Sequence, residues 1–248
     1  MSPDVAPAKP HSKRLLALDT ATELLAVAVV DGDRQWLAEE AGGSLASQRV
    51  LPLVFALLER AGLALADLDA IAFGRGPGAF TGLRMACSVA QGLAFGAALP
   101  VLAIDSLALL AEDAFAAHGA TDVWVAMDAR MDEVYAAAYR RDGAQWDSVR
   151  APALWTLAAL AEAWLREPPV CVAGTALTAF GPRLPCAAAL QLPTPHDRAA
   201  ALARLARAAW QRGEAVDAAL ALPLYLRDKV AQTTAERDAA KAAAAGLA

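Results

Sequence analysis

The chain has 248 residues, a formal net charge of -5 and a hydrophobic fraction of 57%. This length and apolar content suffice to build a core for one large domain or for two lobes, without disulfide bonds. The acidic balance argues against unaided binding to nucleic acid, because such binding relies on clustered lysine and arginine.

The first 13 residues are rich in proline, alanine and polar side chains, and they lack the apolar segment of a secretory signal. We therefore expect a loose N-terminal tail over residues 1–13. No later segment has about 18 uninterrupted apolar residues, which a membrane-spanning helix requires. The three cysteines have no CxxC spacing and lie in apolar sequence, as buried free thiols do: Cys87, Cys171 and Cys186. These features predict a soluble, cytoplasmic protein with no membrane role.

Three strands are expected at the start of the fold, because apolar runs flank the hairpin signal at residues 31–33. A helix over residues 47–61 follows, with apolar residues at three- and four-residue steps and Gly62 as its stop. A strand, a glycine-rich loop, a helix over 83–96 and a strand over 101–104 then alternate, which predicts a sheet with parallel members. We assign residues 14–104 to one mixed α/β lobe.

Residues 105–230 are assigned to a second α/β lobe, and residues 231–248 to an alanine-rich tail. The segment 128–133, between two of its strands, is predicted to be a solvated hairpin. The elements expected in this lobe are a helix capped by Ser106, strands over 123–127 and 133–139, a helix over 155–166, a strand over 170–173, a loop over 182–195 and an amphipathic helix over 197–212.

The glycine-rich stretch at residues 74–82 must form a sharp turn, because its glycines and Pro77 suit neither a helix nor a paired strand. Thr81 is predicted to cap the helix that follows, where free N–H groups would suit an anion. The spacing itself favours a close-packed turn in which a side chain would clash, with the anion site as the alternative. The stretch has neither the Gly-Lys-Ser/Thr ending of a P-loop nor the Rossmann spacing. The candidate anion-binding or nucleotide-proximal residues are Arg75, Gly76, Gly78, Thr81 and Gly82, with Arg84 nearby.

Several segments carry a family resemblance: Leu15-Leu16-Ala17-Leu18-Asp19-Thr20-Ala21-Thr22, Gln48-Arg49-Val50-Leu51-Pro52, the loop Gly74 to Arg84, Ala90-Gln91-Gly92-Leu93-Ala94, Asp128-Ala129-Arg130-Met131-Asp132-Glu133-Val134-Tyr135 and Pro223-Leu224-Tyr225-Leu226-Arg227. Together they resemble the TsaB family, formerly YeaZ, the dimerisation subunits of the bacterial machinery that makes threonylcarbamoyladenosine (t6A) in tRNA. The resemblance covers residues 15–230.

This resemblance implies a two-lobed actin-like, ribonuclease-H-like (ASKHA) α/β fold with mixed sheets flanked by helices. It also implies a protein complex in which this chain pairs with a TsaD-type catalytic subunit and acts with a TsaE-type ATPase. That complex transfers a threonylcarbamoyl group to the adenosine beside the anticodon of ANN-decoding tRNAs. ATP and a divalent metal would serve the partner subunits, and tRNA would be reached through the complex. The chain itself would be a non-catalytic subunit without a cofactor, able to form a homodimer when alone.

The residues themselves are consistent with a non-catalytic role. TsaD-type relatives carry a His-x-x-x-His metal pair where this chain has residues 105–109, and the three histidines, His11, His118 and His196, are scattered. We therefore expect no metal site and no catalytic site. Asp19 lies where actin-like ATPases place an aspartate, but the rest of that phosphate loop is missing, so we expect Asp19 to bind backbone N–H groups. An autonomous actin-like ATPase or sugar kinase is the main alternative, and a metalloprotease the weaker one.

The helices expected over residues 47–61 and 83–96 are predicted to pair with the partner. Both have apolar stripes, and the second has small residues that let helices approach closely. The same surface could serve for self-association. The predicted interface residues are Val50, Val54, Leu57, Arg84, Ala86, Ala90 and Ala94.

Overall fold

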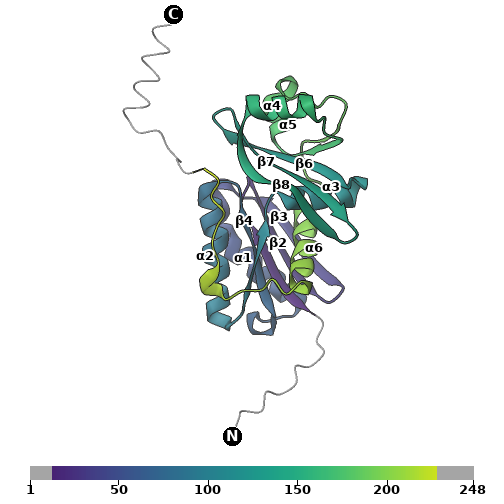
Figure 1. Ribbon diagram of the computed structural model, residues 1–248. Coiled ribbons are helices and arrows are strands. Elements are labelled where there is room, and N and C mark those ends of the chain that lie inside the picture. The colour runs from purple at the N-terminus through teal and green to yellow at the C-terminus, as the bar shows by residue number, and fades with distance from the viewer. Residues whose placement is uncertain (1–12, 228–248) are drawn as a thin grey trace, which may run out of the picture.

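The computed structural model describes residues 13–227 and consists of two lobes, each built on a five-stranded sheet (Figure 1). The strand order is β3-β2-β1-β4-β5 in the first sheet and β10-β9-β6-β7-β8 in the second. The predicted tails, 1–13 and 231–248, lie outside the described residues except for Lys13.

The first sheet is mixed, as the sequence predicts. β1 pairs antiparallel with β2 and parallel with β4, and β4 pairs parallel with β5. Because β1 is central and covered on both faces, its residues are apolar at successive positions rather than at alternate ones. The strands are β1 Arg14–Asp19, β2 Leu24–Asp31, β3 Arg34–Ala41, β4 Ala70–Gly76 and β5 Val101–Asp105.

Helices cover both faces of this sheet (Figure 1). On one face α1 (Ala46–Ala61) and α2 (Phe80–Ala97) pack on Leu16 and Leu18 of β1. On the other face α6 (Arg198–Gln211) packs on Leu15 and Ala17 of the same strand. Successive residues of a strand point to opposite faces, which explains how one short strand serves two cores.

The second lobe has the same layered form. α3 (Ala108–His118) covers one face of its sheet, and α4 (Leu157–Arg166) and α5 (Ala176–Phe180) cover the other. Its strands are β6 Asp122–Arg130, β7 Glu133–Asp142, β8 Gln145–Thr156, β9 Cys171–Ala173 and β10 Leu190–Leu192.

Four local predictions differ from the structure. The loop expected over 182–195 contains β10, which pairs parallel with β9 at the edge of the second sheet. Thr81 lies inside α2, whose N-cap is Ala79, so it caps nothing. Ser106 does not cap α3, because its hydroxyl accepts a hydrogen bond from Gly76 N and donates one to Asp19. The helix expected from residue 155 begins at Leu157, because Thr156 accepts a hydrogen bond from Ala159 N and residues 145–156 form β8.

The division between the lobes also differs from the predicted one. The chain does leave the first sheet after Asp105, but α6 returns to that sheet, and its alanine-rich face lies in the core of the first lobe. Residues 221–227, which we call the strap, then run beside α2 (Figure 1). The C-terminal part of the sequence therefore completes the N-terminal lobe.

Candidate functional site

The glycine-rich loop connects β4 to α2 and packs directly against the turn that follows β1. A Cβ atom at Gly74 would overlap the Asp19 carboxylate, and one at Gly78 would overlap the carbonyl oxygen of Ala21. Gly76 has a φ of 108°, which L side chains rarely adopt. The glycines thus serve close backbone packing, as the spacing in the sequence favours.

Asp19 is fully buried, and both of its carboxylate oxygens are hydrogen bonded within the chain. Oδ1 accepts from Ala21 N at 3.0 Å and from the Arg198 guanidinium at 3.0 Å. Oδ2 accepts from the Ser106 hydroxyl at 2.6 Å. Because Arg198 is itself only 2% exposed, the two charges form a buried ion pair. This agrees with a structural role for Asp19 and adds two partners that the sequence did not indicate.

The two arginines of the loop lie in different surroundings. Arg84 stacks over the Phe80 ring, with 4.0 Å from guanidinium carbon to ring centroid, and donates to the Tyr225 hydroxyl at 3.1 Å. Arg75 instead lines a smaller cavity of about 210 Å³ with Asp105, whose pKa is raised by burial. The structure therefore does not support one anion site formed by both arginines.

The apolar residues predicted to contact a partner lie in the core of the first lobe, which corrects that prediction. Their side chains face the chain's own sheet, because an apolar helix stripe is used first to cover that sheet. The residues concerned are Val50, Val54, Leu57, Ala86, Ala90 and Ala94, each at most 1% exposed.

The outer sides of the same two helices carry apolar side chains that the sequence reasoning missed. Leu51 and Phe55 of α1 are 39% and 50% exposed, and Phe95 of α2 is 60% exposed. Large apolar residues gathered on a surface often mark an interaction site. The sequence did carry one sign of this surface, because Phe55 and Phe95 lie outside the apolar stripes of their helices. We refer to the exposed face made by Leu51, Phe55, Ser88, Gly92, Phe95 and Gly96 as the outer helix face.

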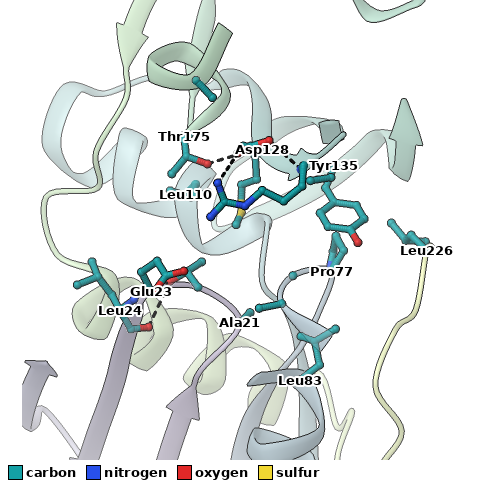
Figure 2. Close-up of a pocket in the computed structure, with 18 of the residues that line it drawn as sticks. Ala21, Glu23, Leu24, Pro77, Leu83, Leu110, Asp128, Tyr135, Thr175 and Leu226 are labelled. Atoms are coloured by element: carbon teal, nitrogen blue, oxygen red, sulfur yellow. Dashed lines mark hydrogen bonds and ion pairs between the residues drawn. The ribbon is translucent and has the colours of Figure 1, made fainter. Parts of the chain in front are cut away.

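A cavity of about 570 Å³ lies between the lobes. Figure 2 shows Ala21, Glu23 and Pro77 on the side of the first lobe, opposite Asp128 and Tyr135 of the second. The strap closes one side with its last residues, 224–227. Arg227 holds the strap to the second lobe, because it donates hydrogen bonds to Glu133 and to the carbonyl oxygen of Arg130.

Within residues 13–227, no group of three or more His, Cys, Asp or Glu side chains is arranged to hold a metal ion. His118 ends α3, His196 donates its backbone N–H to Asp113, and His11 lies outside this part of the chain. The three cysteines are free and buried, and burial raises the pKa of the Cys171 thiol to about 11. In the same range, no helix is both long enough and apolar enough to cross a membrane.

Comparison with known proteins connects this geometry to a family. A family model described as "TsaD: tRNA N6-adenosine threonylcarbamoyltransferase" matches residues 44–235. A solved structure described as YeaZ from Pseudomonas aeruginosa is 43% identical, with a TM-score of 0.78 over 86% of this chain and 100% of that chain. A second Pseudomonas aeruginosa structure, described as similar to peptidase YeaZ, is 44% identical, with a TM-score of 0.79 over 87% of this chain and 100% of that one.

Curated relatives named as the tRNA threonylcarbamoyladenosine biosynthesis protein TsaB match a shorter region. The Haemophilus influenzae protein is 48% identical over 121 residues, which are 49% of this chain and 51% of the relative. The Escherichia coli protein is 46% identical over 129 residues, 52% of this chain and 56% of the relative. The chain thus spans about half the length of the curated relatives it matches.

Two lobes with mixed five-stranded sheets flanked by helices define an actin-like, ribonuclease-H-like α/β protein. The family model and the Pseudomonas aeruginosa structures both extend over most of the chain. The chain belongs to the TsaB/YeaZ family.

Proposed function

We propose that this chain is a non-catalytic partner subunit in t6A biosynthesis that pairs with a TsaD-type transferase. In this proposal the TsaD-type subunit, aided by a TsaE-type ATPase, transfers threonylcarbamoyl to the adenosine beside the anticodon of ANN-decoding tRNAs. ATP and a divalent metal serve those subunits, and tRNA is reached through them in the cytoplasm. The names of the relatives and the matched family model support a role in t6A biosynthesis.

The observation that carries the pairing proposal is a pair of exposed glycines in the last two turns of α2. A Cβ atom at Gly92 or Gly96 would meet nothing within 4 Å, so the described chain itself does not require glycine at either position. Glycine in a helix interior costs about 0.5–1 kcal/mol relative to alanine. Together with Ser88, the glycines form a stripe of small residues at four-residue spacing, which allows a second helix to approach closely.

Large apolar side chains are also exposed on the outer helix face. Phe55 and Phe95 are at least half exposed, although burial of an aromatic ring is strongly favourable. Aromatic residues are enriched in the cores of protein interfaces. We therefore place the pairing surface on the outer sides of α1 and α2, in place of the buried stripes predicted from the sequence.

The residues around Asp19 support the assignment of catalysis to the partners. The carboxylate that would hold a metal in an actin-like ATPase is occupied by Arg198 and Ser106 of the same chain. An autonomous ATPase or sugar kinase remains the alternative. Its distinguishing result would be ATP turnover by the purified chain with added Mg²⁺ that is lost in Asp19→Asn.

The test is reconstitution of threonylcarbamoylation on an ANN-decoding tRNA with a TsaD-type subunit, a TsaE-type ATPase and the enzyme that forms the adenylate. The reaction is run with the parent chain, with Gly92→Leu, with Ala158→Leu and without the chain. Ala158 is an exposed alanine on α4 of the second lobe, so its leucine variant is a control for the added side chain. Size exclusion records whether the pair forms.

We expect activity and a stable pair with the parent and with Ala158→Leu, and loss of both with Gly92→Leu. Full activity without the chain would contradict the proposed role as a required subunit. Pairing that survives Gly92→Leu, in a reaction that still needs the chain, would move the interface away from α2 but leave the partner role intact.

A further inference from the structure

The cavity between the lobes has dimensions and walls typical of a small-molecule site. Its volume of about 570 Å³ lies in the range of about 300–1,000 Å³ found for ligand pockets. Apolar side chains from both lobes and from the strap line most of it: Leu24, Pro77, Leu83, Leu110, Met127 and Leu226. Figure 2 shows several of these side chains around the hollow, with Leu110 from the second lobe and Leu83 from the first.

The charges in the cavity wall do not suit a polyphosphate. Three arginines line it, and each is paired with a carboxylate of this chain: Arg198 with Asp19, Arg130 with Asp128 and Arg227 with Glu133. The wall also contains Glu23, which adds a negative charge. Enzymes that bind transferable phosphates present unneutralised Lys, Arg or metal cations to them. The wall therefore favours an occupant without several negative charges.

A tyrosine hydroxyl in the same wall can orient an uncharged ligand. Tyr135 projects from β7 toward Pro77 (Figure 2), and its hydroxyl makes no hydrogen bond with any of residues 13–227. Burial raises the pKa of Tyr135, so its hydroxyl stays a neutral donor. Arg198, 2% exposed, has an Nε without a hydrogen-bond partner in the same part of the chain. Because this nitrogen is itself buried, the hydroxyl of the partly exposed Tyr135 is the group we assign to the ligand.

We propose that the interlobe cavity binds an uncharged, largely apolar ring compound that carries a hydrogen-bond acceptor. The ring lies between the apolar side chains of the two lobes, and the acceptor faces the hydroxyl of Tyr135. This site is separate from the outer helix face, so the proposal does not depend on the pairing function.

The probe for the test is prodan, an uncharged naphthalene with one carbonyl oxygen, whose emission moves to shorter wavelength in apolar surroundings. Prodan is titrated into the full chain and into Ala179→Trp and Thr178→Trp, which place an indole in the cavity from exposed positions of α5. Ala188→Trp, exposed and outside the cavity lining, is the matched control. Circular dichroism and thermal melting establish that each variant is folded.

We expect saturable binding to one site in the parent and in Ala188→Trp, weakened at least about tenfold by either cavity substitution. Tyr135→Phe should weaken binding by about 2- to 12-fold, the range for one hydrogen bond. Mg²⁺–ATP should not displace the probe. Displacement by Mg²⁺–ATP would overturn the inference in favour of a polyphosphate site. The inference would also be overturned if folded Ala179→Trp and Thr178→Trp bound prodan as tightly as the parent does, or if the parent showed no saturable binding.

Discussion

Gly92 of α2 offers a perturbation whose effects on stability and on pairing have opposite signs. Its Cβ position is open, so Gly92→Ala adds a methyl group without a clash in the isolated chain. Because the residue lies inside an 18-residue helix, alanine should raise the free energy of unfolding by about 0.5–1 kcal/mol. For a chain of this size that corresponds to a rise in Tm of about 1–4 °C.

Affinity for the partner should fall, not rise, when a larger side chain is placed at the same position. Gly92→Leu holds the partner helix away from α2 and exposes another apolar side chain, so its affinity should fall at least about 100-fold, or ~2.7 kcal/mol. Denaturant unfolding at a concentration where the chain is monomeric measures the first effect, and calorimetric titration with the TsaD-type subunit measures the second. Unchanged affinity in Gly92→Leu, with Ala158→Leu also unchanged, would refute the reasoning.

Three further predictions concern the interior. Gly82→Ala should lower the free energy of unfolding by about 1–3 kcal/mol in urea, because its Cβ would overlap the Thr20 carbonyl oxygen; a stable variant would contradict the close packing of the loop. Glu112→Leu should cost about 3–5 kcal/mol by the same measurement, because the buried carboxylate accepts hydrogen bonds from Arg141, Trp146 and Arg204; a cost under 1 kcal/mol would show that this network contributes little. The raised thiol pKa leaves only about 0.1% thiolate at Cys171 at pH 8, so mass spectrometry after iodoacetamide should find this cysteine modified only in denaturant; rapid modification of the native chain would contradict its burial.

The regular elements of the first lobe could be predicted because local signals there agree with the fold. The hairpin glycine, the helical periodicity over residues 47–61 and the left-handed Gly62 at the helix end all act over a few residues. The order of strands and helices then restricts the topology to a right-handed crossover with parallel pairing. The mixed sheet followed from these constraints.

Other parts of the structure depend on contacts between distant residues, which one sequence does not reveal. β8 is mostly exposed, and its polar residues show no alternation, so nothing distinguishes it from a loop and the start of a helix. The return of α6 to the first lobe is fixed by partners such as Glu39, whose side chain accepts from Ala199 N. The interface prediction failed for a related reason: periodicity identifies an apolar stripe, but does not say whether it covers the chain's own sheet or a partner.

The buried contacts of Asp19 connect the architecture with the proposed division of labour. Its carboxylate joins three segments that are far apart in sequence: the end of β1, the crossing between lobes at Ser106 and the start of α6 at Arg198. Both oxygens accept hydrogen bonds inside the fold, and the buried Arg198 has its counter-charge in this carboxylate. The aspartate that positions phosphates in an actin-like ATPase here fastens α6 and the segment after β5 to the end of β1. This suits the proposed role of a partner subunit that leaves the chemistry to another chain.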